Sequence, residues 1–310
     1  MLGVALAILS AFTFSLNSVM ARRGLAHAAA SAGAFITVLL GVPLFFIASL
    51  VTGQLFNAGD VPLNGYVLLG LGGISHFVIG RYFNYRAQAA IGATRAQTVQ
   101  ALNVPYSVGV AWLTLDEQIT PLMGFAIALI IMGPLIIVQR NRAKPKAVPA
   151  GGSTGVAPGE TFQLRQVEGY LSALMTVFAY GTSPIFIRAA LRDVTDVSIY
   201  GGLVSYAVAS LVLIATLAIP GRRVLIRAMN FSTVRLFLGA GTFVFLAQMF
   251  RFMALGIAPV TVVAPLMQTS AVFTLVLSST VNRHLEIINM RVVAGILLSM
   301  TGAILLALYG

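Results

Sequence analysis

The sequence has 310 residues, of which 58% are hydrophobic and only 9% are charged, and its mean hydropathy is +0.94. Soluble domains carry about 25% charged residues, so this composition excludes an ordinary soluble fold. Cysteine is absent, which excludes disulfides and thiolate chemistry. The net charge of +11 lies mostly in short basic loops between apolar runs, so we expect contact with membrane lipids and not with nucleic acid.

Ten apolar stretches are each long enough, at about 20 residues, to cross a hydrocarbon core about 30 Å thick. They lack the period-2 alternation of a membrane β-strand, so all are predicted to be helices. The first is interpreted as a retained span and not a signal peptide, because it lacks a basic leading region. In chain order they cover 2–21, 32–51, 65–85, 93–115, 121–138, 169–190, 197–219, 234–255, 260–281 and 292–309.

A polar segment, residues 139–168, separates the fifth stretch from the sixth. It is rich in Pro, Gly, Ser and Lys and cannot present an apolar face, so it is predicted to be a flexible linker. The linker divides the chain into a first copy, residues 1–138, and a second copy, residues 169–310, each with five predicted helices.

The two copies are related in sequence. A shift of 167 positions places Phe83 on Phe250, and a shift of 169 places Glu117 on Glu286. A nearly constant offset along both copies indicates an internal duplication. Because each copy has an odd number of spans, the second must cross the membrane in the opposite sense. The predicted fold is therefore an all-α polytopic membrane protein with ten transmembrane helices in two inverted five-helix repeats.

The basic residues are distributed unevenly between the two sides of this predicted bundle. Fifteen Lys and Arg residues lie on the side of the linker, whereas only Arg188 and Arg192 lie on the other side. Basic loops remain in the cytoplasm. The count predicts an inner-membrane protein with a cytoplasmic linker and both termini outside.

Two segments carry a family resemblance. The first reads ATRAQTVQALNVPYSVGVAWLTLDE and the second MALGIAPVTVVAPLMQTSAVFTLVLSSTVNRHLE, and each precedes a glycine-containing last helix. They resemble the EamA family of the drug/metabolite transporter superfamily, and the resemblance covers nearly the whole chain. It implies ten helices, alternating access, peripheral fifth helices and a central cavity lined by the first four helices of each copy. Better-known relatives place both termini in the cytoplasm, opposite to the charge count.

The family pattern also differs from this sequence in places. The pattern has a Gly-Glu turn before the last helix of each repeat, whereas here Asp116 precedes Glu117 and Leu285 precedes Glu286. Both glutamates are expected to fix helix starts, where an anion suits the positive end of the helix. The mid-helix proline of the pattern is present as Pro105.

Two arginines, Arg81 and Arg251, lie within predicted helices. The repeat alignment places Gln248 opposite Arg81 and Arg251 opposite Asn84, so an inverted repeat would put the arginines in opposite halves of the membrane. A guanidinium stays charged and offers a planar fork to a carboxylate or phosphate, so the pair is a candidate anion site. The alternative is that each side chain snorkels to its nearer interface. No carboxylate lies inside a predicted helix, which favours an anionic or zwitterionic cargo.

Further polar side chains are candidate substrate contacts. Four polar residues of the fourth helix, Gln97, Gln100, Asn103 and Ser107, fall within an arc of about 120°, and this amide stripe could line a cavity or join helices by hydrogen bonds. His76 could relay protons or simply pack, and Tyr85 could flank a cavity or pack. With Arg81 and Arg251, the candidate substrate-binding set comprises Asn17, His76, Tyr85, Gln97, Gln100, Asn103, Ser183, Gln248 and Gln268.

The leading hypothesis is a secondary transporter for a small polar, anionic or zwitterionic metabolite. A lipid or lipid-linked sugar flippase of the same fold is the alternative. An intramembrane enzyme is disfavoured because there is no HExxH, no thiol and no Asp-rich metal motif, and no metal or cofactor is predicted. Small residues four apart, as at Gly124 and Ala128 or at Gly295 and Ser299, predict close helix contacts, either within the chain or in a homodimer.

Overall fold

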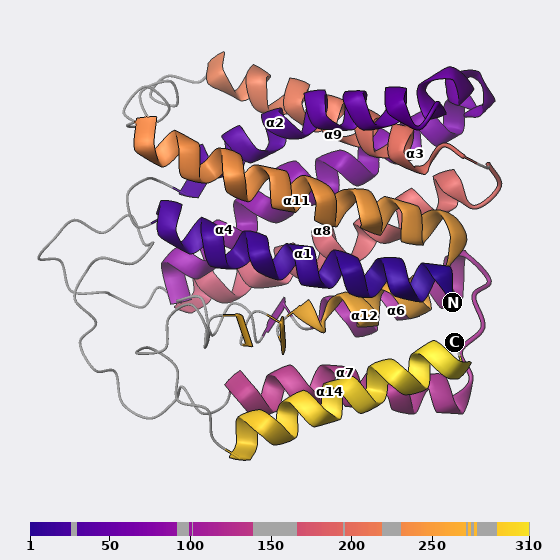
Figure 1. Ribbon diagram of the computed structural model, residues 1–310. Coiled ribbons are helices and arrows are strands. Elements are labelled where there is room, and N and C mark those ends of the chain that lie inside the picture. Colours follow the sequence, from indigo (N-terminus) through magenta and orange to yellow (C-terminus); the bar gives the residue numbers. More distant parts are fainter. Residues whose placement is uncertain are drawn as a thin grey trace, which may run out of the picture.

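The computed structural model describes residues 1–25, 30–91, 99–100, 102–138, 166–194, 196–218, 231–270, 272–273, 276–277 and 290–309. Nearly all of this described part is helical, and it contains no strand. The helices form an elongated bundle in which both termini lie at the same end (Figure 1).

The first, second, third and fifth predicted spans of the first copy are helical, and the third contains an irregular element. The predicted third span is continuous, but its middle, η2, is a π-helix between two α-helical parts. π-Helical turns are uncommon in proteins, and those that occur are often found at functional sites. The elements are α1 (Leu2–Leu25), α2 (Ala30–Val51), the 3₁₀-helix η1 (Gln54–Asp60), α3 (Leu63–Gly73), η2 (Ile74–Gly80), α4 (Arg81–Ile91), α6 (Asn103–Thr114) and α7 (Pro121–Val138).

The second copy begins earlier than the sequence predicts. Its first helix starts at Gln166, inside the segment assigned to the linker, and carries Glu168 in its first turn, where a negative charge suits the helix dipole. Residues 139–165 lie outside the described residues, so the flexible linker stays a prediction. The elements are α8 (Gln166–Leu191), α9 (Ser198–Ala215), the 3₁₀-helix η4 (Thr216–Ala218), α11 (Phe231–Ile257), α12 (Val260–Met267) and α14 (Met290–Tyr309).

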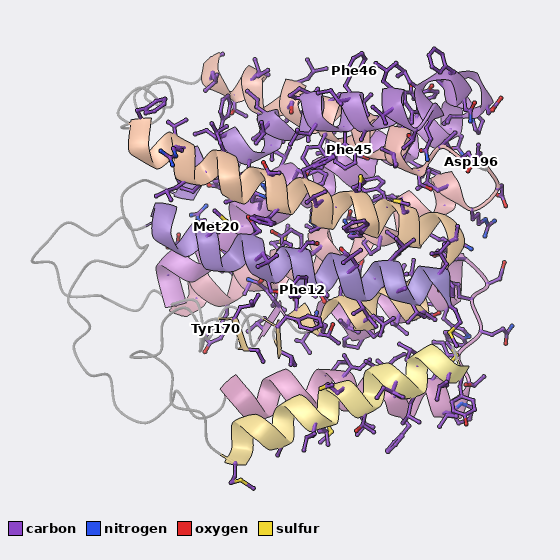
Figure 2. All side chains as sticks on the ribbon, in the orientation of Figure 1. Phe12, Met20, Phe45, Phe46, Tyr170 and Asp196 are labelled. Carbon is purple, nitrogen blue, oxygen red and sulfur yellow. The ribbon has the colours of Figure 1, made fainter. Side chains whose placement is uncertain are left out.

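Within the described residues, five helices are long and apolar enough to cross a membrane. They are Gly33–Val51, Leu63–Asn84, Val167–Leu191, Ser198–Ala218 and Val234–Ile257, and Leu2–Asn17 and Pro121–Gly133 are shorter apolar helices. Large apolar side chains also point outward: Phe46 is 47% exposed, whereas its neighbour Phe45 is fully buried (Figure 2). An apolar outer surface is costly in water but suits a hydrocarbon solvent, as in a multi-pass membrane protein.

Helices of the first copy pack mainly against helices of the second. The principal pairs are α1 with α11, α2 with α9, α3 and α4 with α8, α6 with α12, and α7 with α14. Figure 1 shows α7 and α14 side by side at one edge of the bundle. The two copies therefore share one interior, and neither is a separate domain with its own core.

The fourth and ninth predicted spans are not uninterrupted helices. The helix α6 starts at Asn103 after a turn at Leu102, and α12 ends at Met267, followed by a turn at Gln268 and Thr269. Pro105, predicted to bend the middle of a helix, instead lies in the first turn of α6. There the missing N–H costs no hydrogen bond, because the first N–H groups of a helix have no intrahelical acceptor.

Small residues permit the closest helix approaches. A Cβ atom built on Gly302 of α14 would lie 2.6 Å from the carbonyl oxygen of Ala126 and 2.9 Å from the amide nitrogen of Ile130, both in α7. A Cβ on Gly124 would meet no atom within 4 Å. The close contact expected at Gly124 is therefore not made within the described chain, and a dimer seam there stays a prediction.

Replacing Gly302 with Ala should lower the free energy of unfolding by about 1–3 kcal/mol, because the added methyl group meets backbone atoms that cannot rotate away. Gly124→Ala is the matched control on the partner helix, and it should be neutral or stabilising by about 0.5–1 kcal/mol. The thermal midpoint of the purified protein in detergent measures both. Equal midpoints for Gly302→Ala and the wild type would contradict this account of the α7–α14 contact.

Candidate functional site

The middle of α8, residues 178–184, is where the polar contacts of the bundle converge. Ser75 of η2 donates to the carbonyl oxygen of Ala179 at 2.8 Å, and the hydroxyl groups of Tyr106 in α6 and Thr182 are 3.0 Å apart. Gly181 allows α6 to approach, because a Cβ there would collide with the Tyr106 ring. This segment of α8 thus holds the third and fourth spans of the first copy in place.

Arg251 of α11 is the buried charge of the bundle. Its side chain is 5% exposed, and it donates from Nη1 to Gln248 Oε1 at 3.1 Å and from Nη2 to Ser183 Oγ at 3.4 Å. Among the described residues, these hydrogen-bond partners are neutral. A buried guanidinium is expensive unless polar groups solvate it. Snorkelling to an interface, one of the two sequence interpretations, does not describe Arg251.

Arg81 begins α4 and is less deeply placed. It donates from Nη1 to Thr37 Oγ1 at 3.1 Å, and its guanidinium carbon lies 5.6 Å from the centre of the Phe77 ring, within cation–π range. The Phe77 ring that Arg81 covers also packs against His76 and Tyr206. Arg81 therefore borders an aromatic group that includes His76 and Tyr206.

Aromatic rings fill the space between the arginines. His76 packs against Tyr180, with ring centres 4.6 Å apart, and against Phe77 at 4.8 Å. Tyr206 of α9 packs against Phe77 at 4.2 Å. His76 is thus packed as one of the sequence interpretations proposed, although its Nδ1 has no hydrogen-bond partner among the residues that the structure describes. Tyr206 was not among the predicted site residues, because a single tyrosine in an apolar helix has the pattern of ordinary packing.

The amide side chains form two bridges between helices. Gln100 donates to Asn84 Oδ1 at 2.9 Å, and Asn84 donates to the Tyr180 hydroxyl at 3.4 Å. Gln268 donates to Asn103 Oδ1 at 2.9 Å. This second bridge joins the start of α6 to the turn after α12, where helical hydrogen bonding is interrupted in both copies.

The predicted amide stripe on the fourth span needs a correction. Its geometry assumed one continuous helix, but the turn at Leu102 separates Gln100 from Asn103, so the two side chains reach different partners. Gln97 lies outside the described residues. Tyr85 lies in α4, but its side chain is outside the described part, and Asn17 is half-buried in α1.

The predicted residues therefore fall into groups. Arg251, Gln248 and Ser183 are in direct contact, His76 and Arg81 lie in the adjoining aromatic region, and the two amide bridges connect helices beside them. Among the described residues, no three His, Asp or Glu side chains gather as a metal site would require.

Glu117 holds the start of a helix in the other copy. Its Oε1 accepts from the amide of Val260 and its Oε2 from that of Thr261, each at 2.8 Å, so it caps α12 and not α7, which follows it in the chain. The expected helix-start role is confirmed for Glu117, whereas Glu286 lies outside the described residues. Asp116 has a φ of 55°, the left-handed region that favours glycine, which accounts for the glycine of the family pattern.

A cation holds the other side of the same turn. Arg188 of α8 donates to the carbonyl oxygens of Leu255 at 3.0 Å and Gly256 at 2.9 Å, at the C-terminal end of α11. The turn between α11 and α12 is thus fixed by a cation at a negative helix end and an anion at a positive one. From its sequence position alone, Arg188 is only one of two basic residues on the less basic side of the bundle.

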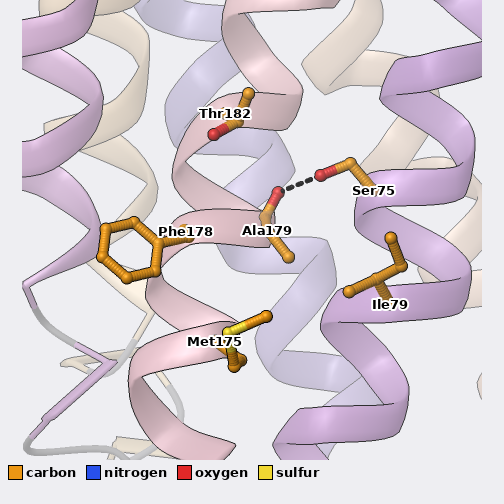
Figure 3. A pocket seen from close by; sticks show the side chains of 6 residues that line it. All are labelled: Ser75, Ile79, Met175, Phe178, Ala179 and Thr182. Atoms are coloured by element: carbon orange, nitrogen blue, oxygen red, sulfur yellow. Dashed lines mark hydrogen bonds between the residues drawn. The ribbon is translucent and has the colours of Figure 1, made fainter.

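An open hollow of about 210 Å³ lies between η2 and α8 (Figure 3). Most of its wall is apolar, and the hydrogen bond from Ser75 to Ala179 crosses from one helix to the other within it. It is lined by Ser75, Ile79, Met175, Phe178, Ala179 and Thr182.

Comparisons with known proteins agree with this architecture. A family model described as the EamA-like transporter family matches residues 1–139 and 167–308. A crystal structure described only as that of a protein superposes with a TM-score of 0.73 at 15% sequence identity, covering 99% of this chain and 97% of the other. At that identity the likeness shows the fold alone. No curated protein sequence matches significantly.

Replacing Glu117 with Ala should destabilise the protein by about 1–2 kcal/mol, because two backbone N–H groups at the start of α12 lose their acceptor. Hydrogen exchange should rise in residues 260–267 more than elsewhere. Gln118→Ala, at the exposed neighbouring position, is the control and should change neither the melting temperature nor the exchange. Unchanged exchange in Glu117→Ala would show that the cap does not hold α12.

Proposed function

Because the chain belongs to the EamA-like transporter family, we propose that it is a secondary transporter which moves a small polar, anionic or zwitterionic metabolite across the inner membrane by alternating access. Members of this family are membrane transporters and not enzymes. The cargo would bind between the two copies, at the group formed by Arg251, Gln248 and Ser183.

The proposed inverted repeat is supported by the packing of the helices. The first helix of each copy packs against the third span of the other copy. Thus α1 packs against α11, and α8 packs against α3 and α4. In Figure 1, α1 runs away from the end that carries both termini, whereas α8 runs toward it, and α7 and α14 likewise run in opposite directions. A duplicated unit with an odd number of spans would produce this relation.

Arg251 is the observation that carries the proposal. A buried guanidinium bonded to a neutral amide and a hydroxyl retains its positive charge, so a carboxylate or phosphate would be attracted to it strongly in a medium of low dielectric constant. The planar fork would bind two oxygens of such a group. Arg81 would supply a second positive charge on the far side of the aromatic region.

Alternating access would use the interrupted helices. The amide bridge from Gln268 to Asn103 links the interruptions of α6 and α12. Discontinuous helices near the midplane are a recurring device of secondary transporters, because their ends can bend and contact cargo. At the end that carries the termini, Glu117 and Arg188 hold the α11–α12 turn against the rest of the bundle, so opening that end would require these contacts to separate.

A lipid or lipid-linked sugar flippase is the second candidate. The open, mainly apolar hollow between η2 and α8 favours it, because a lipid substrate needs a side opening. Its wall shares η2 with His76, so a headgroup could pass from the hollow toward the polar interior.

Replacing Arg251 with Ala should lower the affinity for an anionic cargo about 10- to 100-fold, the loss expected for hydrogen bonds to a charged group. The affinity of Arg251→Lys should lie between that of the wild type and that of Arg251→Ala. Counterflow in proteoliposomes, with a panel of amino acids, hydroxy acids, dicarboxylates and phosphate monoesters, measures this. Arg235→Ala, at an exposed position of the same helix, is the matched control. Full transport of an anion by Arg251→Ala would refute the arginine site, and movement of fluorescent lipid without any solute counterflow would favour the flippase.

The proposed orientation has its own test. If the basic side is cytoplasmic, a C-terminal alkaline phosphatase fusion should be active and a C-terminal green fluorescent protein fusion dark. A fluorescent C-terminal fusion would place the termini in the cytoplasm and reverse the orientation.

A further inference from the structure

Within the described part of the chain, two buried polar atoms beside the candidate anion site have no hydrogen-bond partner. They are the hydroxyl oxygen of Tyr206 and Nδ1 of His76. The Tyr206 side chain is fully buried, with its ring 4.2 Å from that of Phe77 and 5.0 Å from that of Phe45. Buried polar groups in native proteins are nearly always hydrogen-bonded, so each exception calls for an explanation.

The other unpartnered atoms have a simpler explanation. Buried hydroxyl groups of Ser49, Ser210 and Thr261 also lack a partner, but each is short and lies within a helix. Such hydroxyls can rotate toward a carbonyl of the preceding turn at little cost. A phenol oxygen is held at the far end of a rigid ring and cannot reach its own backbone, so Tyr206 has no local alternative.

Both atoms are connected to Arg251 through packed side chains. Ser183, which accepts from Arg251, lies three residues after Tyr180 and therefore on the same face of α8, and the Tyr180 ring packs on His76. On the other side, Phe45 packs against Tyr206 and also against Phe245 and Phe252 of α11, the helix that carries Arg251. The unpartnered atoms and the guanidinium thus belong to one contiguous region.

The charges in this region select the kind of group that would fit. The Arg81 guanidinium lies over Phe77, whose ring packs against Tyr206 and His76, and Arg251 is bonded to Ser183, three residues from the Tyr180 that packs on His76. Two positive charges in a medium of low dielectric constant favour an oxygen, neutral or negative, and oppose an ammonium group. A tyrosine hydroxyl and an imidazole nitrogen are each suited to a hydroxyl or carbonyl oxygen.

Building on the transport function proposed above, we propose that Tyr206 and His76 bind a second, oxygen-bearing group of the cargo beside the carboxylate held by Arg251. The site then selects 2-hydroxy acids over the corresponding 2-amino acids and over acids that carry only hydrogen at carbon 2. This narrows the anionic or zwitterionic cargo to an anionic one, and it makes Tyr206 a specificity-determining residue.

L-malate, succinate and L-aspartate test the selection, because they share a four-carbon dicarboxylate frame and differ only in carrying a hydroxyl, a hydrogen or an ammonium group at one carbon. Their affinities are measured by thermal stabilisation of the purified full-length protein in detergent. We expect malate to bind about 10-fold more tightly than succinate, as for a lost hydrogen bond, and aspartate to bind most weakly. In Tyr206→Phe, the affinity for malate should fall to that for succinate, while the affinity for succinate should not change.

Two controls separate this role from a structural one. Ser210→Ala removes a buried, unpartnered hydroxyl one turn farther along α9 and should leave all three affinities unchanged. Without ligand, Tyr206→Phe should melt no lower than the wild type, because it removes only an unpaired polar atom, whereas a structural hydroxyl would lower the melting temperature. His76→Phe, which keeps a ring against Tyr180, should also reduce the preference for malate.

The outcomes separate this inference from the transport proposal. If Tyr206→Phe keeps the preference for malate, or if aspartate binds the wild type as tightly as malate, the inference is wrong while anion transport stands. Equal binding of malate and succinate likewise overturns only the inference. If none of the three acids binds and no metabolite of the counterflow panel is exchanged, the transport proposal fails and the inference fails with it.

Discussion

The guanidinium of Arg251, held in the middle of an apolar bundle, is the constraint around which the interior is arranged. A charge at that depth needs polar partners, and it takes them from Gln248 on its own helix and Ser183 on α8. Those contacts require α8 and α11 to lie close together. Around them, small residues allow helices of the two copies to meet backbone to backbone, as Gly73 does against Ser205.

The two copies match one family model, but the residues of the candidate site are not equivalent in the two copies. Arg251 and Arg81 do not occupy equivalent positions, since Gln248 is the counterpart of Arg81. The third span of the first copy contains the π-helix η2, whereas its counterpart α11 is a continuous helix of 27 residues. A cargo bound off the symmetry axis would meet different chemistry on its two sides, as an asymmetric metabolite requires.

The contacts at the end near the termini differ in kind from those of the centre. There, Glu117 and Arg188 interact with helix ends through charge and backbone groups, while the centre relies on amides, hydroxyls and rings. In the proposed alternating access, contacts between a charge and a helix end could be exchanged for water on opening of that end, because both partners would then be solvated. The buried polar groups of the centre cannot exchange their contacts for water in this way, and only an entering ligand would offer them new partners.

Local sequence was sufficient for the helical class, for the order of the described helices, for the two related copies and for the unusual character of Arg81 and Arg251. Hydropathy and composition are properties of consecutive residues, and α7 begins and ends at the predicted residues. Only the tertiary structure decided that the fourth span is interrupted before α6 and the ninth after α12, and that Glu117 caps a helix 143 residues away. The same holds for the pairing of Arg251 with Ser183, 68 residues apart, and for the burial of Tyr206 between Phe45 and Phe77. Such partners are set by which faces meet when two copies of a unit pack together, and no local periodicity in the chain encodes that meeting.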